Sequence, residues 1–263
     1  MDLTAEYENG AYIPNASDYI ARWEVDAQAF RDALGPRARL GVKTGDAPRN
    51  RLDLFAPNEA PLGLLVFIHG GYWRRFDRSL WSHFAAGPLA AGWAVAMPSY
   101  TLAPQAAISR ITEEVAQALT LAAGLVAGPI VITGHSAGGH LSARMRCEDV
   151  DLPPDVAARI ARIVPISPVS DLRPLIHTQM NADLRLSEAE AVAESPVLAT
   201  ELRDIPTDIW VGAEERPAFL DQARWLTEAW PDTRQVIDPG RHHFDVIDGL
   251  KDALSPLCRT LFA

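Results

Sequence analysis

Residues 134–138 are Gly-His-Ser-Ala-Gly, a G-x-S-x-G pattern with a serine between two glycines. An apolar, β-branched run at residues 129–133 precedes it, and a helix-compatible stretch at residues 139–146 follows. This order of strand, pentapeptide and helix predicts a nucleophile elbow, a sharp turn that exposes the Ser136 hydroxyl at a sheet edge. Gly134 and Gly138 suit the turn because side chains there would collide across it. We therefore expect Ser136 to be a nucleophile.

A second glycine pair follows the first long apolar run, where residues 69–73 are His-Gly-Gly-Tyr-Trp. Gly70 and Gly71 allow the backbone to turn and present N–H groups, which acyl transfer needs wherever charge develops on a carbonyl oxygen. The N–H of Ala137, directly after the serine, would complete such an oxyanion hole. His69 precedes the turn, so we expect it to support this loop rather than act as a base.

A serine nucleophile needs a histidine and a carboxylate, and the candidates lie late in the chain. His242 and His243 follow the last apolar strand, and an imidazole can accept the serine proton and return it near neutral pH. Glu214 and Glu215 follow the preceding strand and could orient that imidazole. The residues alone leave both pairs open. Structural or surface roles are expected for the remaining candidates, which are His83, His135, His140, His177, Asp208, Asp238 and Asp245.

The periodicity of apolar residues predicts strands that alternate with helices, and hence a mostly parallel central sheet with helices on both faces. Strands are expected at residues 39–43, 51–55, 62–68, 93–97, 129–133, 160–166, 207–211 and 235–237. Helices are expected around residues 17–34, 80–91, 111–126, 139–146 and 219–230, and from about 244 to the end. We interpret residues 1–263 as a single domain. Its N-terminal segment, residues 1–38, contains a helix capped by Ser17 and Asp18. Residues 173–204 are expected to form a cap of one or two helices above the carboxyl edge of the sheet.

The composition restricts the partners. The chain has 263 residues, 48% of them hydrophobic, and a formal net charge of −10. Such an acidic balance argues against a nucleic-acid partner. No apolar run is long enough to predict a membrane span, and the first residues do not resemble a secretory signal. We expect a cytoplasmic protein that acts on a small-molecule substrate, with a homodimer as one option for its oligomeric state.

No cofactor or metal is expected from the sequence. Cys147 and Cys258 lie far apart and lack metal-ligand spacing, so free thiols are the simpler interpretation. The chain contains neither a phosphate-binding G-x-x-x-x-G-K-[ST] motif nor an H-x-x-x-H pair, and no G-x-G-x-x-G follows a predicted strand.

Together these motifs resemble those of serine hydrolases with the α/β-hydrolase fold, in the esterase and lipase group, and most closely the kynurenine formamidase-like (arylformamidase-like) enzymes. The resemblance spans nearly the whole chain. It is carried by residues 69–73, which match H-G-G-x-W, and by residues 98–104, 134–141, 215–219 and 243–245.

The resemblance implies a catalytic triad of Ser136 as nucleophile, Glu215 as acid and His243 as base. It also implies oxyanion donors at Gly70, Gly71 and Ala137, and substrate contacts at Tyr72 and Trp73 that would suit an aromatic leaving group. The family usually carries aspartate where this chain has Glu215, but glutamate also serves in such triads.

The activity expected from this resemblance is hydrolysis of a small aryl formamide or ester through an acyl-enzyme. A general carboxylesterase or thioesterase would use the same residues, because the pocket rather than the triad sets the substrate. A ligand-binding protein on the same scaffold, without turnover, is the third hypothesis, and it predicts a broken triad.

Overall fold

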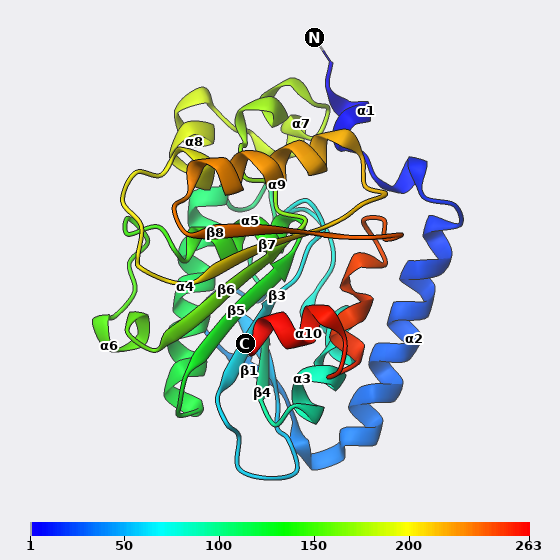
Figure 1. The fold of residues 1–263 in the computed structure, drawn as a ribbon, viewed down its shortest axis with the longest axis vertical. Helices are drawn as coiled ribbons and strands as arrows, with labels where there is room; N and C mark the ends of the chain where they lie inside the picture. Colours follow the sequence, from blue (N-terminus) through cyan, green and yellow to red (C-terminus); the bar gives the residue numbers. More distant parts are fainter. Residues whose placement is uncertain (1) are drawn as a thin grey trace.

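The computed structural model describes residues 2–263 and contains one eight-stranded sheet. Its strand order is β1-β2-β4-β3-β5-β6-β7-β8, and the strands from β4 to β8 in that order run parallel (Figure 1). Within residues 2–263, β2 is the strand that runs antiparallel to its neighbours, β1 and β4. The strands are β1 (Ala38–Lys43), β2 (Arg51–Phe55), β3 (Leu64–Ile68), β4 (Ala94–Pro98), β5 (Ile130–His135), β6 (Ile160–Ile166), β7 (Thr207–Gly212) and β8 (Thr233–Asp238). The expected mostly parallel sheet is confirmed.

Helices cover both faces of this sheet. The α-helices are α1 (Thr4–Tyr7), α2 (Ala16–Leu34), α3 (Ala86–Ala90), α4 (Ile108–Leu125), α5 (Ala137–Arg144), α6 (Pro154–Ala157), α7 (Asn181–Leu184), α8 (Glu188–Ala193), α9 (Pro217–Ala229) and α10 (Pro256–Leu261). The 3₁₀ helices are η1 (Gly10–Tyr12), η2 (Gly35–Arg37), η3 (Arg78–Ala85), η4 (Arg173–His177), η5 (Pro196–Leu198) and η6 (Val246–Lys251). Among residues 2–263, no helix is both long and apolar enough to cross a membrane.

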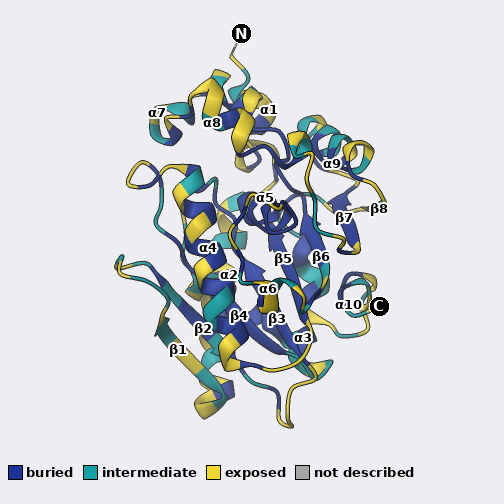
Figure 2. Ribbon diagram, turned by 90° about the vertical axis from the view of Figure 1, so that its left-hand side faces the viewer, coloured by how far each residue is buried: buried dark blue, intermediate teal, exposed yellow. Residues whose placement is uncertain are grey.

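The central strands are buried on both faces, as the continuous apolar run at β3 indicates. Alternate residues of a strand point to opposite faces, so Leu64 and Val66 pack in the cluster with α4, while Leu65 and Phe67 pack in the cluster with α2 and η3. Figure 2 shows the result, in which the middle of the sheet is uniformly buried and β1 at the edge is partly exposed.

Three predicted helices differ from the structure. Helix α2 begins at Ala16 after Asn15, whose φ is 54°, and Ser17 and Asp18 lie within its first turn without capping it. The expected C-terminal helix is divided into η6 and α10. Ser255 caps α10 by accepting the N–H of Cys258, 3.0 Å away, and Pro256 lacks the N–H that a continuous helix would need. The stretch at 80–91 is likewise divided, into η3 and α3.

Residues 173–204 form four short helices, η4, α7, α8 and η5, instead of the expected one or two. Proline lies in the first turn of both η4 and η5, and Arg185 takes a left-handed φ of 54° directly after α7, so the segment is divided into short helices. This segment contacts the N-terminus, since the Leu3 N–H donates to the carbonyl of His177 over 2.9 Å. Figure 1 shows α7 and α1 at the same end of the molecule.

Candidate active site

Ser136 lies at the turn between β5 and α5 with φ 59° and ψ −117°, a conformation that residues other than glycine rarely adopt. The flanking glycines are required by close approach of the backbone. A Cβ atom at Gly134 would lie 2.2 Å from the carbonyl oxygen of Gly138, and one at Gly138 would lie 2.0 Å from that of Ile68. The predicted reason for both glycines therefore holds at this turn.

Glu215 and His243 form a buried pair beside this serine. Glu215 lies in the loop after β7 and His243 in the loop after β8. Nδ1 of His243 donates to Oε2 of Glu215 over 2.6 Å, and both side chains are almost fully buried. This bond leaves Nε2 of His243 as the unprotonated, basic nitrogen. The Phe219 ring packs against the imidazole with its centroid 4.4 Å away.

The second carboxylate oxygen of Glu215 is held by two further donors. Oε1 accepts the backbone N–H of Gly212 over 3.0 Å and the hydroxyl of Ser167. Sequence reasoning missed Ser167, although a serine directly after the buried strand β6 was a usable signal, because parallel strands end at one edge of the sheet. Its hydroxyl and the Gly212 N–H hold Glu215 in one orientation.

The structure distinguishes the two alternatives that the residues left open. Glu214 is exposed on the same loop. Nε2 of His242 lies 3.1 Å from the hydroxyl of Tyr19, while its Nδ1 accepts backbone N–H groups. Only His243 and Glu215 form a buried pair at Ser136. Asp208 lies at the opposite end of β7 and pairs with Arg162 and Arg234.

A pocket of about 150 Å³ contains both Ser136 and His243. Within residues 2–263, no hydrogen bond of the Ser136 hydroxyl is found, and hydrogen bonds between reacting groups are often long in structures without substrate. The lining includes aromatic rings from several elements. The lining residues are Glu8, Gly10, Ala16, Ser17, Ile20, Trp23, Gly71, Tyr72, Arg75, Phe76, Trp81, His135, Ser136, His243 and Phe244.

One wall of this pocket is the N-terminal segment, from Glu8 to Trp23. The hydroxyl of Tyr72 anchors that segment, since it donates to the carbonyl of Tyr7 over 2.9 Å and accepts the N–H of Asn9 over 3.1 Å. No residue of 173–204 lines the pocket. The short helices of this segment pack on one another and on α1, α5 and α9.

The three residues expected as oxyanion donors lie near Ser136 in the structure or next to it in the chain. A Cβ atom at Gly70 would lie 3.2 Å from Cβ of Ser136, and Gly71, with φ 113°, lines the pocket. Ala137 is the first residue of α5, where backbone N–H groups have no partner within the helix. These N–H groups are therefore available to an oxygen at the serine.

Trp73 does not line the pocket, so its predicted role as a substrate contact is wrong. It is completely buried, and its ring packs edge-on against His140 at a centroid distance of 5.1 Å. Tyr72 and Trp73 both have a φ of 56°, which turns the chain so that Tyr72 reaches the pocket and Trp73 enters the core.

Two buried histidines support the site in their neutral forms. Burial, and to a lesser degree the neighbouring His243, hold the pKa of His135 well below its usual value, and its Nε2 donates to the carbonyl of His243 over 2.8 Å. Burial lowers the pKa of His69 to about 4, and its ring stacks on Tyr100 at 4.4 Å. In the described residues, no group of three or more His, Cys, Asp or Glu could hold a metal ion.

Comparison with known proteins gives the family. The model of the alpha/beta hydrolase family matches residues 65–262. The chain belongs to that family. The match begins in β3 and includes Ser136, Glu215 and His243, whereas the N-terminal wall of the pocket lies outside it. The fold expected from the sequence, the α/β-hydrolase fold, is confirmed.

Several relatives of this alpha/beta hydrolase have names that describe their activity. Kynurenine formamidase of Danio rerio is 29% identical over 270 residues, 95% of this chain and 91% of that protein. Kynurenine formamidase of Drosophila melanogaster is 29% identical over 222 residues, 76% of this chain and 73% of that protein. The expected resemblance to kynurenine formamidases is confirmed.

Two solved structures share the fold. A crystal structure of a proposed thioesterase from Silicibacter sp. TM1040 is 53% identical and has a TM-score of 0.98, covering 100% of both chains. Esterase B from Lactobacillus Rhamnosis is 17% identical with a TM-score of 0.69, covering 93% of this chain and 90% of that one. At that identity the esterase supports the fold alone.

Proposed function

We propose that this protein is a serine hydrolase that cleaves a small aryl formamide or ester through an acyl-enzyme. Ser136 is the nucleophile, His243 the base and Glu215 the acid. The observation that carries the proposal is the buried Glu215–His243 pair, joined over 2.6 Å, in the same pocket as a serine on a strained elbow. A nucleophile, a base and an orienting acid in these relations are the parts of a serine hydrolase.

The reaction uses these groups in turn. Nε2 of His243 accepts the Ser136 proton while Oγ attacks the substrate carbonyl, and Glu215 stabilises the resulting imidazolium. Backbone N–H groups of Gly70, Gly71 and Ala137 donate to the oxyanion, and one such donor is worth about 3–4 kcal/mol. His243 then protonates the leaving amine or alcohol. Water, deprotonated by the same nitrogen, hydrolyses the acyl-enzyme and restores the serine.

The pocket and the relatives favour a small substrate with an aromatic group. The pocket measures about 150 Å³ and is lined by the rings of Trp81, Tyr72 and Phe244. Aromatic walls of this kind stack on or pack edge-on against a planar ring. The kynurenine formamidases of fish and fly support a formamide as the scissile group.

A second candidate, a carboxylesterase or thioesterase, is favoured by the proposed thioesterase at 53% identity. The two candidates are separated by kcat/KM for N-formylkynurenine, 4-nitrophenyl acetate and S-phenyl thioacetate. We expect the formamide to have the highest value. Turnover of the ester or the thioester without turnover of the formamide would assign the protein to the second class.

The serine mechanism is tested by covalent labelling. We expect a fluorophosphonate probe to label the wild-type protein and not Ser136→Ala, because the probe phosphonylates an activated serine. Ser17→Ala is the matched control, since Ser17 is the other serine that lines the pocket and lies on the N-terminal wall. It should label like the wild type. A wild-type protein that stays unlabelled would favour the third hypothesis, a binding protein without turnover.

A further inference from the structure

The loop that carries the oxyanion glycines, residues 69–78, has an unusual backbone. Within six residues, Gly71 has φ 113°, Tyr72 and Trp73 have φ 56°, and Phe76 has φ 71°. A non-glycine residue in the left-handed region costs of order 1–3 kcal/mol and persists only where its surroundings hold it. The loop therefore needs anchors outside itself.

The first part of the loop is held by a hydrogen bond to its first residue and by hydrogen bonds within its own turn. The hydroxyl of Tyr100 donates to the carbonyl of His69 over 3.0 Å. The carbonyl of Gly71 accepts the N–H groups of Arg74 and Arg75 at 3.0 and 2.9 Å. These contacts close the turn but do not fix where its far end lies.

The far end contacts Gly71 directly. A Cβ atom at Gly71 would lie 2.5 Å from the carbonyl oxygen of Arg75 and 2.8 Å from Cδ2 of Phe76. Close packing of this kind transmits displacement, since there is no free space to absorb it. A shift of residues 75–76 would therefore move the Gly71 N–H relative to Ser136.

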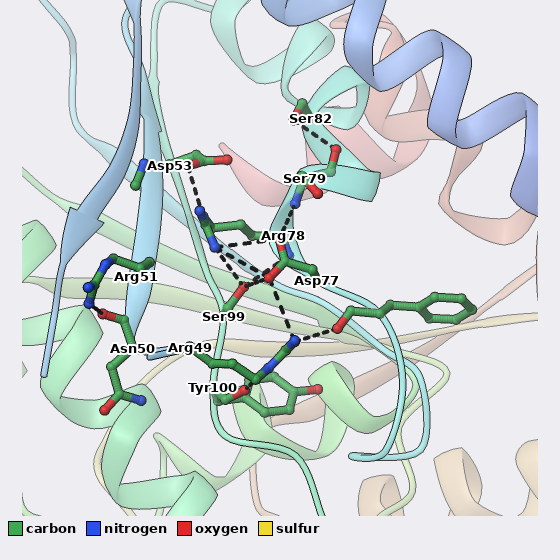
Figure 3. A network of polar contacts seen from close by, with 12 residues as sticks. Arg49, Asn50, Arg51, Asp53, Asp77, Arg78, Ser79, Ser82, Ser99 and Tyr100 are labelled. Atoms are coloured by element: carbon green, nitrogen blue, oxygen red, sulfur yellow. Dashed lines mark hydrogen bonds and ion pairs between the residues drawn. The ribbon is translucent and has the colours of Figure 1, made fainter. Parts of the chain in front are cut away.

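Arg49, in the connection between β1 and β2, holds this far end (Figure 3). Its Nε donates to the carbonyl of Tyr100 over 2.9 Å, and its NH2 group donates to the carbonyl of Phe76. The same guanidinium lies 3.7 Å from the carboxylate of Asp77. One rigid fork thus joins the left-handed Phe76 to the loop after β4.

A second set of contacts holds the next two residues. Nε of Arg78 donates to Oδ1 of the buried Asp53 on β2 over 2.8 Å. The Ser99 hydroxyl accepts the Arg78 N–H and donates to Asp77, both over 3.0 Å. Figure 3 shows both sets meeting at Asp77. The network is partly buried, and its paired groups link the loop to β2 and to the loop after β4, so it can hold a strained segment.

We propose that Arg49 is a positioning residue for the oxyanion hole, which it acts on by fixing the Phe76 end of the 69–78 loop. This inference rests on the proposed function of Ser136 and its oxyanion donors. Arg49 does not line the pocket, so it acts on the reaction only through the loop. This role of Arg49 links the antiparallel β1–β2 hairpin, at the edge of the sheet, to the site.

The test compares Arg49→Met with Arg51→Met in 4-nitrophenyl acetate hydrolysis. We expect Arg49→Met to lower kcat by about 10–100-fold with KM within about twofold, because misplacing a reacting group by about 1 Å can cost 10²-fold. Arg51 is the matched control, since its guanidinium donates only to the carbonyl of Asn50. Arg51→Met should keep the wild-type kcat. Arg49→Lys should fall between, because an ammonium cannot bridge both carbonyls as the fork does.

A second measurement separates positioning from general destabilisation. Phenylboronic acid forms a tetrahedral adduct with an active serine and places an oxygen in the oxyanion hole, so its affinity should fall by the same factor as kcat. If Arg49→Met does not fold, Ser99→Ala replaces it and should also lower kcat and boronate affinity, by a smaller factor.

Three results would overturn the inference. The first is a wild-type kcat and boronate affinity in folded Arg49→Met, or in Ser99→Ala where it is the substitute. The second is an equal loss in Arg51→Met. Both leave the proposed function intact if the wild type is active. A wild-type protein with neither turnover nor fluorophosphonate labelling would overturn the proposed function, and this inference with it.

Discussion

The carboxylate of Glu215 accepts three hydrogen bonds, each from a different part of the chain. Gly212 at the end of β7, Ser167 after β6 and His243 after β8 supply the donors. Three donors from separate segments fix the direction of the carboxylate. Glu215, which stands where the family usually has aspartate, is therefore held by hydrogen bonds at both of its carboxylate oxygens.

Replacing Glu215 by glutamine should inactivate the protein without unfolding it. The amide cannot stabilise the imidazolium or select the tautomer of His243, and the corresponding change in a serine protease lowers kcat by about 10⁴. We expect a fall in kcat of about 10³–10⁴-fold, measured on the best of the three substrates above. Glu214→Gln is the control, because Glu214 is exposed on the same loop. Equal losses in both variants would contradict the assignment of the acid.

At the scale of elements, the elbow joins β5 to α5 at contact distance from β3. Its glycines meet backbone atoms, namely the carbonyl oxygens of Gly138 and Ile68, and backbone cannot move aside as a flexible side chain can. The same strand–turn–helix unit places Ser136 at the turn and Ala137 at the first position of α5. Precision at the site thus depends on how tightly three elements pack.

Gly138→Ala should be strongly destabilising. Its Cβ atom would lie 2.0 Å from the Ile68 oxygen, so the helix must move away from the sheet, and overpacking of this kind typically costs about 1–3 kcal/mol or more. Gly124→Ala in α4 is the matched control. A Cβ atom there meets nothing within 4 Å, and alanine should stabilise the helix by about 0.5–1 kcal/mol. Denaturant unfolding measures both, and a neutral Gly138→Ala would contradict the close-contact argument.

The N-terminal segment is the other element that the site depends on. It is anchored at Tyr7 and Asn9 by the Tyr72 hydroxyl, and Arg216 donates to the carbonyl of Ala5 over 2.9 Å while its guanidinium stacks on the Tyr12 ring at 3.7 Å. The 69–78 loop, which carries the expected N–H donors, therefore also supports the N-terminal wall of the pocket through Tyr72.

At the scale of the whole molecule, several histidines are buried in the neutral form. Burial lowers the pKa of His83 and of His69 to about 4, and that of His140 to about 3, from a usual value of 6.5. Between pH 6.5 and pH 4 the unfolded chain binds protons that the folded chain does not. The free energy of unfolding must therefore fall as the pH drops through this window, and recover above pH 6.5.

His83→Leu should reduce this acid sensitivity. Both ring nitrogens of His83 are buried without a partner, so leucine leaves no hydrogen bond unmade. The positive charges of nearby Lys251 and Arg22 lower the pKa of His83 further. Asp26 and Asp248 raise this pKa, but by less than burial lowers it. The variant should lose up to about 3 kcal/mol less stability than the wild type between pH 7.5 and pH 4.5, at about 1.4 kcal/mol per pKa unit. Guanidinium unfolding at both pH values measures this.

His177→Gln is the control for that measurement, because the His177 side chain is exposed. It should show the wild-type loss of stability on acidification. An identical pH dependence in His83→Leu and the wild type would contradict this prediction, because it would show that protonation of His83 does not favour the unfolded state.

The sequence by itself determined the parts of this protein that depend on neighbours in the chain. Short apolar runs bounded by turn residues predicted all eight strands, and the G-x-S-x-G pattern predicted the elbow, because an apolar run and a glycine at a tight turn are local properties. The residues alone left His242 and His243, and Glu214 and Glu215, as open alternatives, whereas the tertiary structure pairs His243 with Glu215. The sequence does not distinguish two adjacent side chains of the same type in a loop, because the backbone conformation decides which one points toward the interior and which toward solvent.

Tertiary structure also decided which segments enclose the pocket. The N-terminal wall lies more than a hundred residues before Ser136, and the Arg49 fork bridges segments that are far apart in the sequence. Trp73 entered the core, against expectation, and no residue of 173–204 lines the pocket. The physical reason is that the neighbours of a side chain depend on how distant elements pack. The free energy of burial and the hydrogen-bond partners across the fold therefore leave no local pattern in the sequence.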